Sequence, residues 1–196
     1  MRKIWIASAT LASLSVIGCS DTMNSNMMST NNNNSAAVNS NMATSSPARS
    51  LALTSGDREF LKEAAAGGIA EVEMGRLASQ KAQNADVKRF GERMVTDHSK
   101  ANAELKQVAA SKDVTVPAEP NAEQKEEMDK LSKLSGAAFD REYMRMMVED
   151  HDKDVKAFQD QANGTGDADV KSFASKTLPT LQEHQKMAHD IAAKLK

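Results

Sequence analysis

The chain has 196 residues with a net charge of −2, and it is 40% hydrophobic, 27% charged and only 4% aromatic. This length allows one ordinary globular domain with extensions. The near-neutral charge argues against a nucleic-acid-binding protein, which would concentrate basic residues on one face. Few aromatic residues and many Ala, Met, Lys and Glu favour helices over sheets.

The first 18 residues have the layout of a secretory signal peptide. Two basic residues precede an apolar run over residues 4–17, which is too short to span a membrane as a helix. The run ends in VIGC, residues 16–19, which resembles the lipobox of bacterial lipoproteins, where the signal is cut before a cysteine that carries the lipid. We therefore expect residues 1–18 to be removed and Cys19 to carry a lipid anchor. An ordinary signal peptide with an incidental cysteine is the alternative.

The residues after Cys19 suggest a location and a tether. In bacterial lipoproteins, a residue other than Asp at the position of Ser20 usually implies sorting to the outer membrane, so we expect an outer-membrane lipoprotein facing the periplasm. A secreted periplasmic protein is the alternative, and the lipid anchor is the only contact with a membrane that the sequence indicates. Residues 19–53 are rich in Asn, Ser, Thr and Met. They contain too little apolar material to offset the entropy of ordering, which predicts a disordered tether.

From residue 54 the pattern becomes helical, and residues 54–196 are predicted to form one all-α domain. Thr54 or Ser55 is expected to cap the first helix. Apolar side chains at spacings of three and four predict long helices at about 54–83, 85–110, 137–163 and 168–195. A shorter polar helix is expected at about 121–134.

Two motifs recur with one common shift of 83 residues. DREF at 57–60 reappears as DREY at 140–143, and ADVKRF at 85–90 reappears as ADVKSF at 168–173. The second helical hairpin therefore resembles a copy of the first, with coincidence among helix caps as the alternative.

The connection between the hairpins decides the topology. Long, one-sided helices bury their apolar stripes well in a four-helix bundle. Residues 111–136 are long enough, with their own short helix, to run the length of a bundle about 40 Å long. The second and third long helices should then be parallel and diagonal. The fold class expected is a ferritin-like four-helix bundle with a long crossover.

Each long helix carries one polar residue on its apolar stripe near the midpoint, and two of these lie in the related segments MVTDHSK (94–100) and MVEDHDK (147–153). The four residues are Glu71, His98, His151 and His184. Side chains at one height in a bundle should meet in its core. Imidazole nitrogen with a carboxylate oxygen suits a single Fe²⁺, Zn²⁺, Mn²⁺ or Cu²⁺ ion. A metal-free, hydrogen-bonded cluster that only fixes packing is the alternative.

Other acidic residues lie near these histidines. Asp154 is one helical turn beyond His151 and is the candidate for a fifth ligand. Acidic residues directly precede three histidines of the sequence, and because a helix turns about 100° per residue they should lie off the apolar stripe, as outer-shell or solvent-exposed groups. These residues are Asp97, Asp150 and Glu183.

Di-iron and nucleophilic chemistry find no support in the sequence. Ferritin-like di-iron proteins use a Glu three residues before a ligand His on two helices. Here Val95 precedes His98 at that spacing, and Leu181 precedes His184. The sequence also has no Gly-rich phosphate loop, no Gly-x-Ser-x-Gly elbow and no CxxC pair. We therefore expect a binding or structural envelope protein rather than an enzyme.

The folded part as a whole resembles a known family. Residues 59–105, EFLKEAAAGGIAEVEMGRLASQKAQNADVKRFGERMVTDHSKANAEL, are similar to the first half of the bacterial family called domain of unknown function 4142. FDREYMRMMVEDHDKDVKAF, followed by LPTLQEHQKMAHDI, is similar to its second half. The resemblance implies an exported protein with a ferritin-like fold, and it matches the family's recurrent Glu and His positions to the four core residues named above. It implies no activity.

Overall fold

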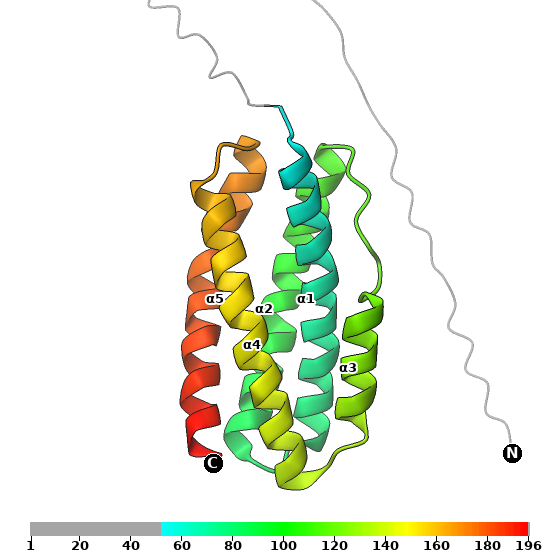
Figure 1. Ribbon diagram of the computed structural model, residues 1–196, viewed down its shortest axis with the longest axis vertical. Coiled ribbons are helices and arrows are strands. Elements are labelled where there is room, and N and C mark those ends of the chain that lie inside the picture. Colours follow the sequence, from blue (N-terminus) through cyan, green and yellow to red (C-terminus); the bar gives the residue numbers. More distant parts are fainter. Residues whose placement is uncertain (1–51, 196) are drawn as a thin grey trace, which may run out of the picture. The chain divides into compact units, whose positions relative to one another are not determined.

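The computed structural model describes residues 52–195, so the predicted signal peptide, Cys19 and nearly all of the tether lie outside the described residues. Within this range the chain forms five α-helices and no strand (Figure 1). They are α1 (Ser55–Lys81), α2 (Ala85–Ser111), α3 (Ala122–Ser132), α4 (Gly136–Asn163) and α5 (Ala168–Lys194). The all-α class is confirmed, with four long helices and a short fifth helix in the connection.

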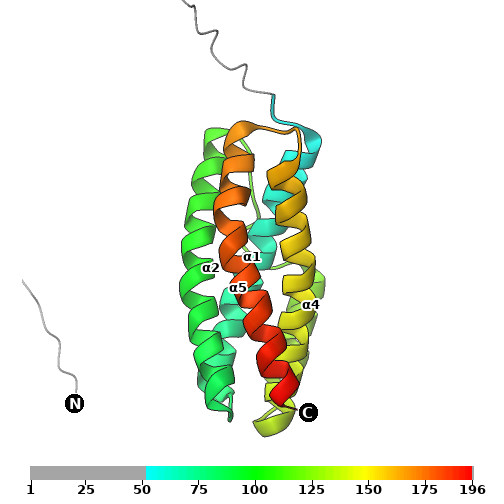
Figure 2. The same ribbon diagram turned by 90° about the vertical axis from the view of Figure 1, so that its left-hand side faces the viewer.

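The long helices form two antiparallel hairpins, α1 with α2 and α4 with α5 (Figure 1). The hairpins pack together through α1 against α4 and α2 against α5. Figures 1 and 2 show that α2 and α4 run in one direction and α1 and α5 in the other. The long connection between α2 and α4 returns along the bundle and places α3 against α1 and α4. This is the direction of the helices that the sequence predicted.

Helix starts are set by local side-chain caps. Thr54, rather than Ser55, is the N-cap of α1. Its side chain accepts a hydrogen bond from the Asp57 amide, and the Asp57 carboxylate accepts one from the Thr54 amide. Asn84 and Asp167 are the N-caps of α2 and α5, and the side chain of each accepts hydrogen bonds from two backbone amides. Such caps satisfy N–H groups that a helix cannot satisfy internally.

The repeated motifs have a structural role. The buried Asp57 carboxylate of α1 accepts a hydrogen bond from the Asp167 amide, 3.0 Å away in the turn of the other hairpin. The equivalent carboxylate of α4, Asp140, accepts from the Asn84 amide at 2.8 Å in the turn between α1 and α2. Each hairpin therefore fixes the turn of the other through an equivalent residue. Coincidence among caps does not explain this reciprocal pattern.

The interior contains two apolar clusters, one toward each end of the bundle. One contains Phe60, Leu105, Phe158 and Phe173, and the other contains Phe90, Met94, Tyr143 and Met147. On α2, α4 and α5 the sequence passes from one cluster to the other through a single buried histidine. The core is thus interrupted near mid-height by a polar layer. Within the described part of the chain, none of the helices has both the length and the apolar character needed to cross a bilayer.

Candidate metal centre

Three histidines from three helices meet in the polar layer. His98 of α2, His151 of α4 and His184 of α5 are at most 5% exposed. Their ring centroids are 5.3 to 5.7 Å apart. One ring nitrogen from each lies within 4.8 Å of the other two. We refer to these three residues as the histidine cluster.

Each ring of the histidine cluster has one nitrogen engaged by a hydrogen-bond acceptor. His98 Nδ1 lies 2.8 Å from Glu71 Oε2. His184 Nε2 lies 2.8 Å from Asp97 Oδ2, and His151 Nδ1 lies 2.9 Å from the Met147 carbonyl oxygen. The ionised Asp97 and the Met147 carbonyl are acceptors, so His184 Nε2 and His151 Nδ1 carry the ring proton, and His98 Nδ1 carries it when Glu71 is ionised.

The opposite nitrogens are therefore left as lone pairs. They are His98 Nε2, His151 Nε2 and His184 Nδ1, all buried and without a hydrogen-bond partner among residues 52–195. An acceptor on the far side of a ligating imidazole is the usual way in which proteins fix the ring for a metal. Each histidine of the cluster thus has one buried ring nitrogen available to a metal.

Burial also fixes the charge of the cluster. Removal from water lowers the pKa of His98, His151 and His184 to about 4 each. At neutral pH the three rings are therefore uncharged, and the neutral imidazole is the form that binds a metal ion. A metal does not have to displace protons from these nitrogens at pH 7.

Glu71, the fourth predicted ligand, lies beside the cluster rather than within its closest group. Its Oε2 is engaged by His98, whereas its Oε1 has no hydrogen-bond partner and lies 3.6 Å from His151 Nε2. Burial raises the pKa of Glu71 to about 7, although the nearby His151 acts in the opposite direction. Oε1 is therefore the nearest candidate to complete a coordination shell around the histidines.

The remaining acidic residues separate into different roles. The half-buried Asp154 lies against Glu71, and burial together with the Glu71 charge raises its pKa well above the usual range. It is not one of the residues whose donor atoms converge. Asp97 lies off the stripe, as predicted, and accepts from His184, whereas Glu183 forms a 2.8 Å ion pair with Arg93.

Two further groups were not singled out by the sequence. Arg93 of α2 contacts both Asp97, at 3.1 Å, and Glu183, so it fixes the carboxylate that holds His184. The Tyr143 hydroxyl is fully buried without a hydrogen-bond partner, and burial and the charge of Glu71 raise its pKa. From its position on the apolar stripe of the sequence, Tyr143 is predicted to be an ordinary core aromatic residue. The spacing of Arg93 and Asp97, four residues apart on one helix, is the signal that could have indicated their pairing.

The donor set fits a divalent transition metal. Neutral imidazole nitrogens with one nearby carboxylate oxygen suit Zn²⁺ or Cu²⁺ well, whereas Mg²⁺ or Ca²⁺ would require mainly oxygen ligands. A buried polar atom left without a partner costs on the order of 1–3 kcal/mol. Four such atoms, three ring nitrogens and Glu71 Oε1, gather at this place.

Solved structures with a similar fold come from several bacteria. A DUF305 fragment from Deinococcus radiodurans matches with a TM-score of 0.64 and 11% identity, covering 73% of this chain and 99% of that one. A DUF305 protein from Streptomyces coelicolor matches with a TM-score of 0.60 and 16% identity, covering 71% and 93%. A dodecameric thioferritin, the bacterioferritin-related protein of Bacteroides fragilis, matches with a TM-score of 0.54 and 12% identity, covering 71% and 85%. These likenesses show a shared helical fold.

Sequence comparison identifies the family. No protein with a curated description matches the chain. The family model described as domain of unknown function, DUF4142, matches residues 42–191 and so covers all five helices except the last residues of α5. The chain belongs to the DUF4142 family.

Proposed function

We propose that this protein is a ferritin-like metal-binding protein of the cell envelope that holds one divalent transition-metal ion at the histidine cluster. Two observations about the described residues 52–195 carry the proposal: each histidine has a buried ring nitrogen without a hydrogen-bond partner, and one ring nitrogen from each lies within 4.8 Å of the other two. His98 Nε2, His151 Nε2 and His184 Nδ1 would supply three ligands, and Glu71 Oε1 the fourth. When bound, the ion would act as a Lewis acid, in a site that the surrounding helices shield from bulk water.

The alternative is a metal-free cluster that only fixes helix packing. In that case the polar groups should satisfy one another. The pairs with Glu71, Asp97 and the Met147 carbonyl do so for one side of each ring only. On the other side, each ring has a nitrogen lone pair that can only accept, and no described group donates to it. Such an arrangement favours a cation over mutual hydrogen bonding.

Binding is favoured over catalysis by the surroundings of the site. Beyond the carboxylates already described, the rings lie among apolar core side chains such as Phe90, whose ring centroid lies 6.2–6.3 Å from those of His151 and His184. Three nitrogens and one oxygen favour Zn²⁺ or Cu²⁺ among the ions considered, with Fe²⁺ and Mn²⁺ as weaker fits.

The proposed location rests on the sequence around Cys19. A lipid on Cys19 would anchor the protein to the outer membrane and leave the helical domain in the periplasm. Metabolic labelling with a fatty acid tests the anchor, because lipidation requires the Cys19 thiol: the wild-type chain should take up the label and Cys19→Ser should not. A wild-type chain that takes up no label would contradict lipid anchoring.

Elemental analysis of the protein purified from the detergent-extracted envelope fraction tests the proposed metal centre. We expect about one transition-metal ion per chain, lost in His98→Ala and in His184→Ala. His189→Ala is the matched control, because His189 lies on α5 but is exposed and contacts Asp152 at 3.0 Å. Circular dichroism melting would verify that each variant is folded. Absence of metal after loading with Zn²⁺, Cu²⁺, Fe²⁺ or Mn²⁺ would leave the cluster as a packing element.

A further inference from the structure

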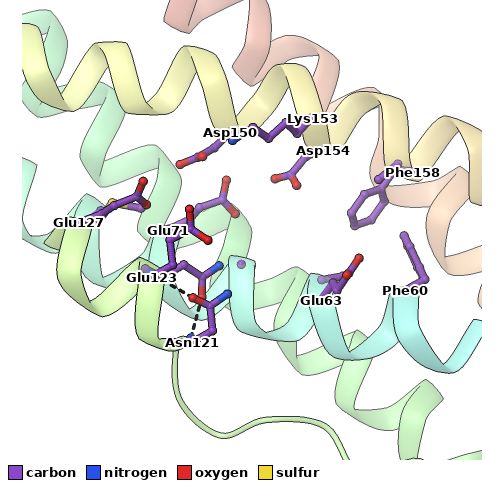
Figure 3. Close-up of a pocket in the computed structure, with 16 residues that line it drawn as sticks. Phe60, Glu63, Glu71, Asn121, Glu123, Glu127, Asp150, Lys153, Asp154 and Phe158 are labelled. Atoms are coloured by element: carbon purple, nitrogen blue, oxygen red, sulfur yellow. Dashed lines mark hydrogen bonds between the residues drawn. The ribbon is translucent and has the colours of Figure 1, made fainter.

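A pocket of about 320 Å³ lies between α1, α3 and α4, beside the histidine cluster. Carboxylates from all three helices line it, and Figure 3 shows those of Glu71, Glu127, Asp150 and Asp154 pointing into the same space. Among the described residues that line the pocket, Lys153 is the single cationic one. The concentration of negative charge from three separate helices requires an explanation, because like charges repel one another.

Exposure decreases from the mouth of this pocket to its floor. Glu123 at the mouth is exposed, Glu127 and Asp150 are half-buried, and Glu71 at the floor is 3% exposed. Glu71 is also the unpartnered polar group here, because its Oε1 has no hydrogen-bond partner. The pocket therefore leads from solvent to a buried carboxylate that contacts the histidines.

The floor of the pocket continues toward the metal centre. A small cavity of about 20 Å³ is lined by His98 together with Glu71 and Asp154, the two carboxylates that also line the larger pocket. This volume is sufficient for about one water molecule. Glu71 thus has one oxygen on His98 and lines both spaces, so it lies on the boundary between pocket and cluster.

We propose that this acidic pocket is the route by which a hydrated divalent cation reaches the histidine cluster, with Glu127 and Asp150 holding the ion in transit and Glu71 receiving it at the floor. This inference rests on the proposed metal-binding function. Carboxylate oxygens accept hydrogen bonds from the water shell of a cation, and a cleft of one charge sign raises the local concentration of the opposite ion. The histidines then replace that water shell at the buried end.

The arrangement of charges in the pocket supports this role. Glu127 of α3 and Asp150 of α4 line the same pocket, and like charges repel one another. A dication between the two carboxylates would remove this repulsion. The surface of α3 that carries Glu123 and Glu127 therefore has a role in holding the cation, in addition to keeping a short polar helix soluble.

The rate at which Co²⁺ binds tests the route, because Co²⁺ held by histidines has a visible absorption band that stopped-flow mixing can follow. The test variant is the double change Glu123→Gln and Glu127→Gln, which removes two charges from the pocket without touching a histidine. The matched control is Glu59→Gln with Glu92→Gln, which removes the same charge from exposed positions on α1 and α2. We expect the association rate at low salt to fall about 3–10-fold in the pocket variant and to change little in the control.

The outcomes separate the route from the metal site itself. The difference between the two variants should shrink in high salt, where screening acts over shorter distances. Equal rates in wild type and pocket variant, or equal slowing in the control, would overturn the route while the final absorption spectrum still showed a filled histidine site. A wild-type protein that never develops the spectrum would instead overturn the proposed metal centre and, with it, the route.

Discussion

The orientation of His184 depends on Asp97, and this dependence gives the sharpest prediction. The Asp97 carboxylate accepts from His184 Nε2 at 2.8 Å and from Arg93 Nε at 3.1 Å through the same oxygen. Although burial acts in the opposite direction, these hydrogen bonds hold the pKa of Asp97 below its usual range, so the group is ionised at neutral pH. Asp97→Asn replaces a charged acceptor with a neutral amide whose NH₂ group can also donate to the ring.

Two consequences follow from that change. The charge-assisted hydrogen bond is lost, and when the amide donates to Nε2 the ring proton moves to Nδ1, the nitrogen that faces the cluster. Loss of an outer acceptor of this kind typically lowers metal affinity 10–100-fold, or about 1.4–2.8 kcal/mol. We expect a loss of that size for Asp97→Asn, with the helical fold unchanged.

Competition between the protein and a chromophoric chelator for Zn²⁺ would measure this loss. Glu183→Gln is the matched control, because it also takes a carboxylate from Arg93 but contacts no histidine of the cluster. Its affinity should stay within about twofold of wild type. The reasoning would be refuted if Asp97→Asn bound Zn²⁺ as tightly as wild type, or if Glu183→Gln lost as much affinity.

Four further predictions concern pH and stability. NMR titration of the histidine cluster should give midpoints near pH 4, and midpoints near 6.5 would contradict its burial. Because the histidines bind protons at a higher pH in the unfolded protein than in the folded one, the histidine cluster lowers the free energy of unfolding of the metal-free protein as pH falls from 6.5 to 4. The raised pKa of Glu71 has the opposite effect, because it stabilises the folded protein as pH falls from 7 to 4.5. The free energy of unfolding of Glu71→Gln, measured with urea, should therefore decrease more steeply than that of wild type as pH falls from 6.5 to 5. A slope equal to that of wild type would contradict this. Asp140→Ala should cost about 1–3 kcal/mol in urea denaturation, because two backbone amides lose their acceptor, and a cost below 0.5 would count against that role. Gly91→Ala should cost about 1–3 kcal/mol, because its Cβ would lie 2.8 Å from the Gly75 carbonyl oxygen, where α1 and α2 cross; a neutral result would show that the helices can separate.

The helices were predictable because their limits are encoded locally. Thr54, Asn84, Asn121 and Asp167 are cap residues whose side chains accept backbone hydrogen bonds within three positions. Helical spacing then places one face of each helix inward, whatever the partner helix is. The meeting of three histidines followed from their equal height on these faces.

The chemistry of the cluster was less accessible from sequence. Which ring nitrogen is free depends on side-chain rotamers and on acceptors from other helices, such as Glu71 of α1 for His98. For His151 the acceptor is a backbone carbonyl, that of Met147, which no residue pattern reveals. The acidic pocket was hidden for a related reason, because Glu123 and Glu127 in a polar helix indicate only a solvated surface until α3 is placed against α1 and α4.

The internal repeat finally bears on why the histidines are present. The shift of 83 residues places Glu71 on Asp154, so both hairpins supply a carboxylate to the pocket floor, as both supply an Asp that fixes the opposite turn. No histidine of the cluster obeys this shift: the partners of His98, His151 and His184 are Leu181, Gly68 and Ala101. Packing of two similar hairpins therefore does not require them, since small or apolar residues serve at the equivalent places. Three buried imidazoles that break the repeat and still converge on one point are better explained by a ligand they share than by the fold they interrupt.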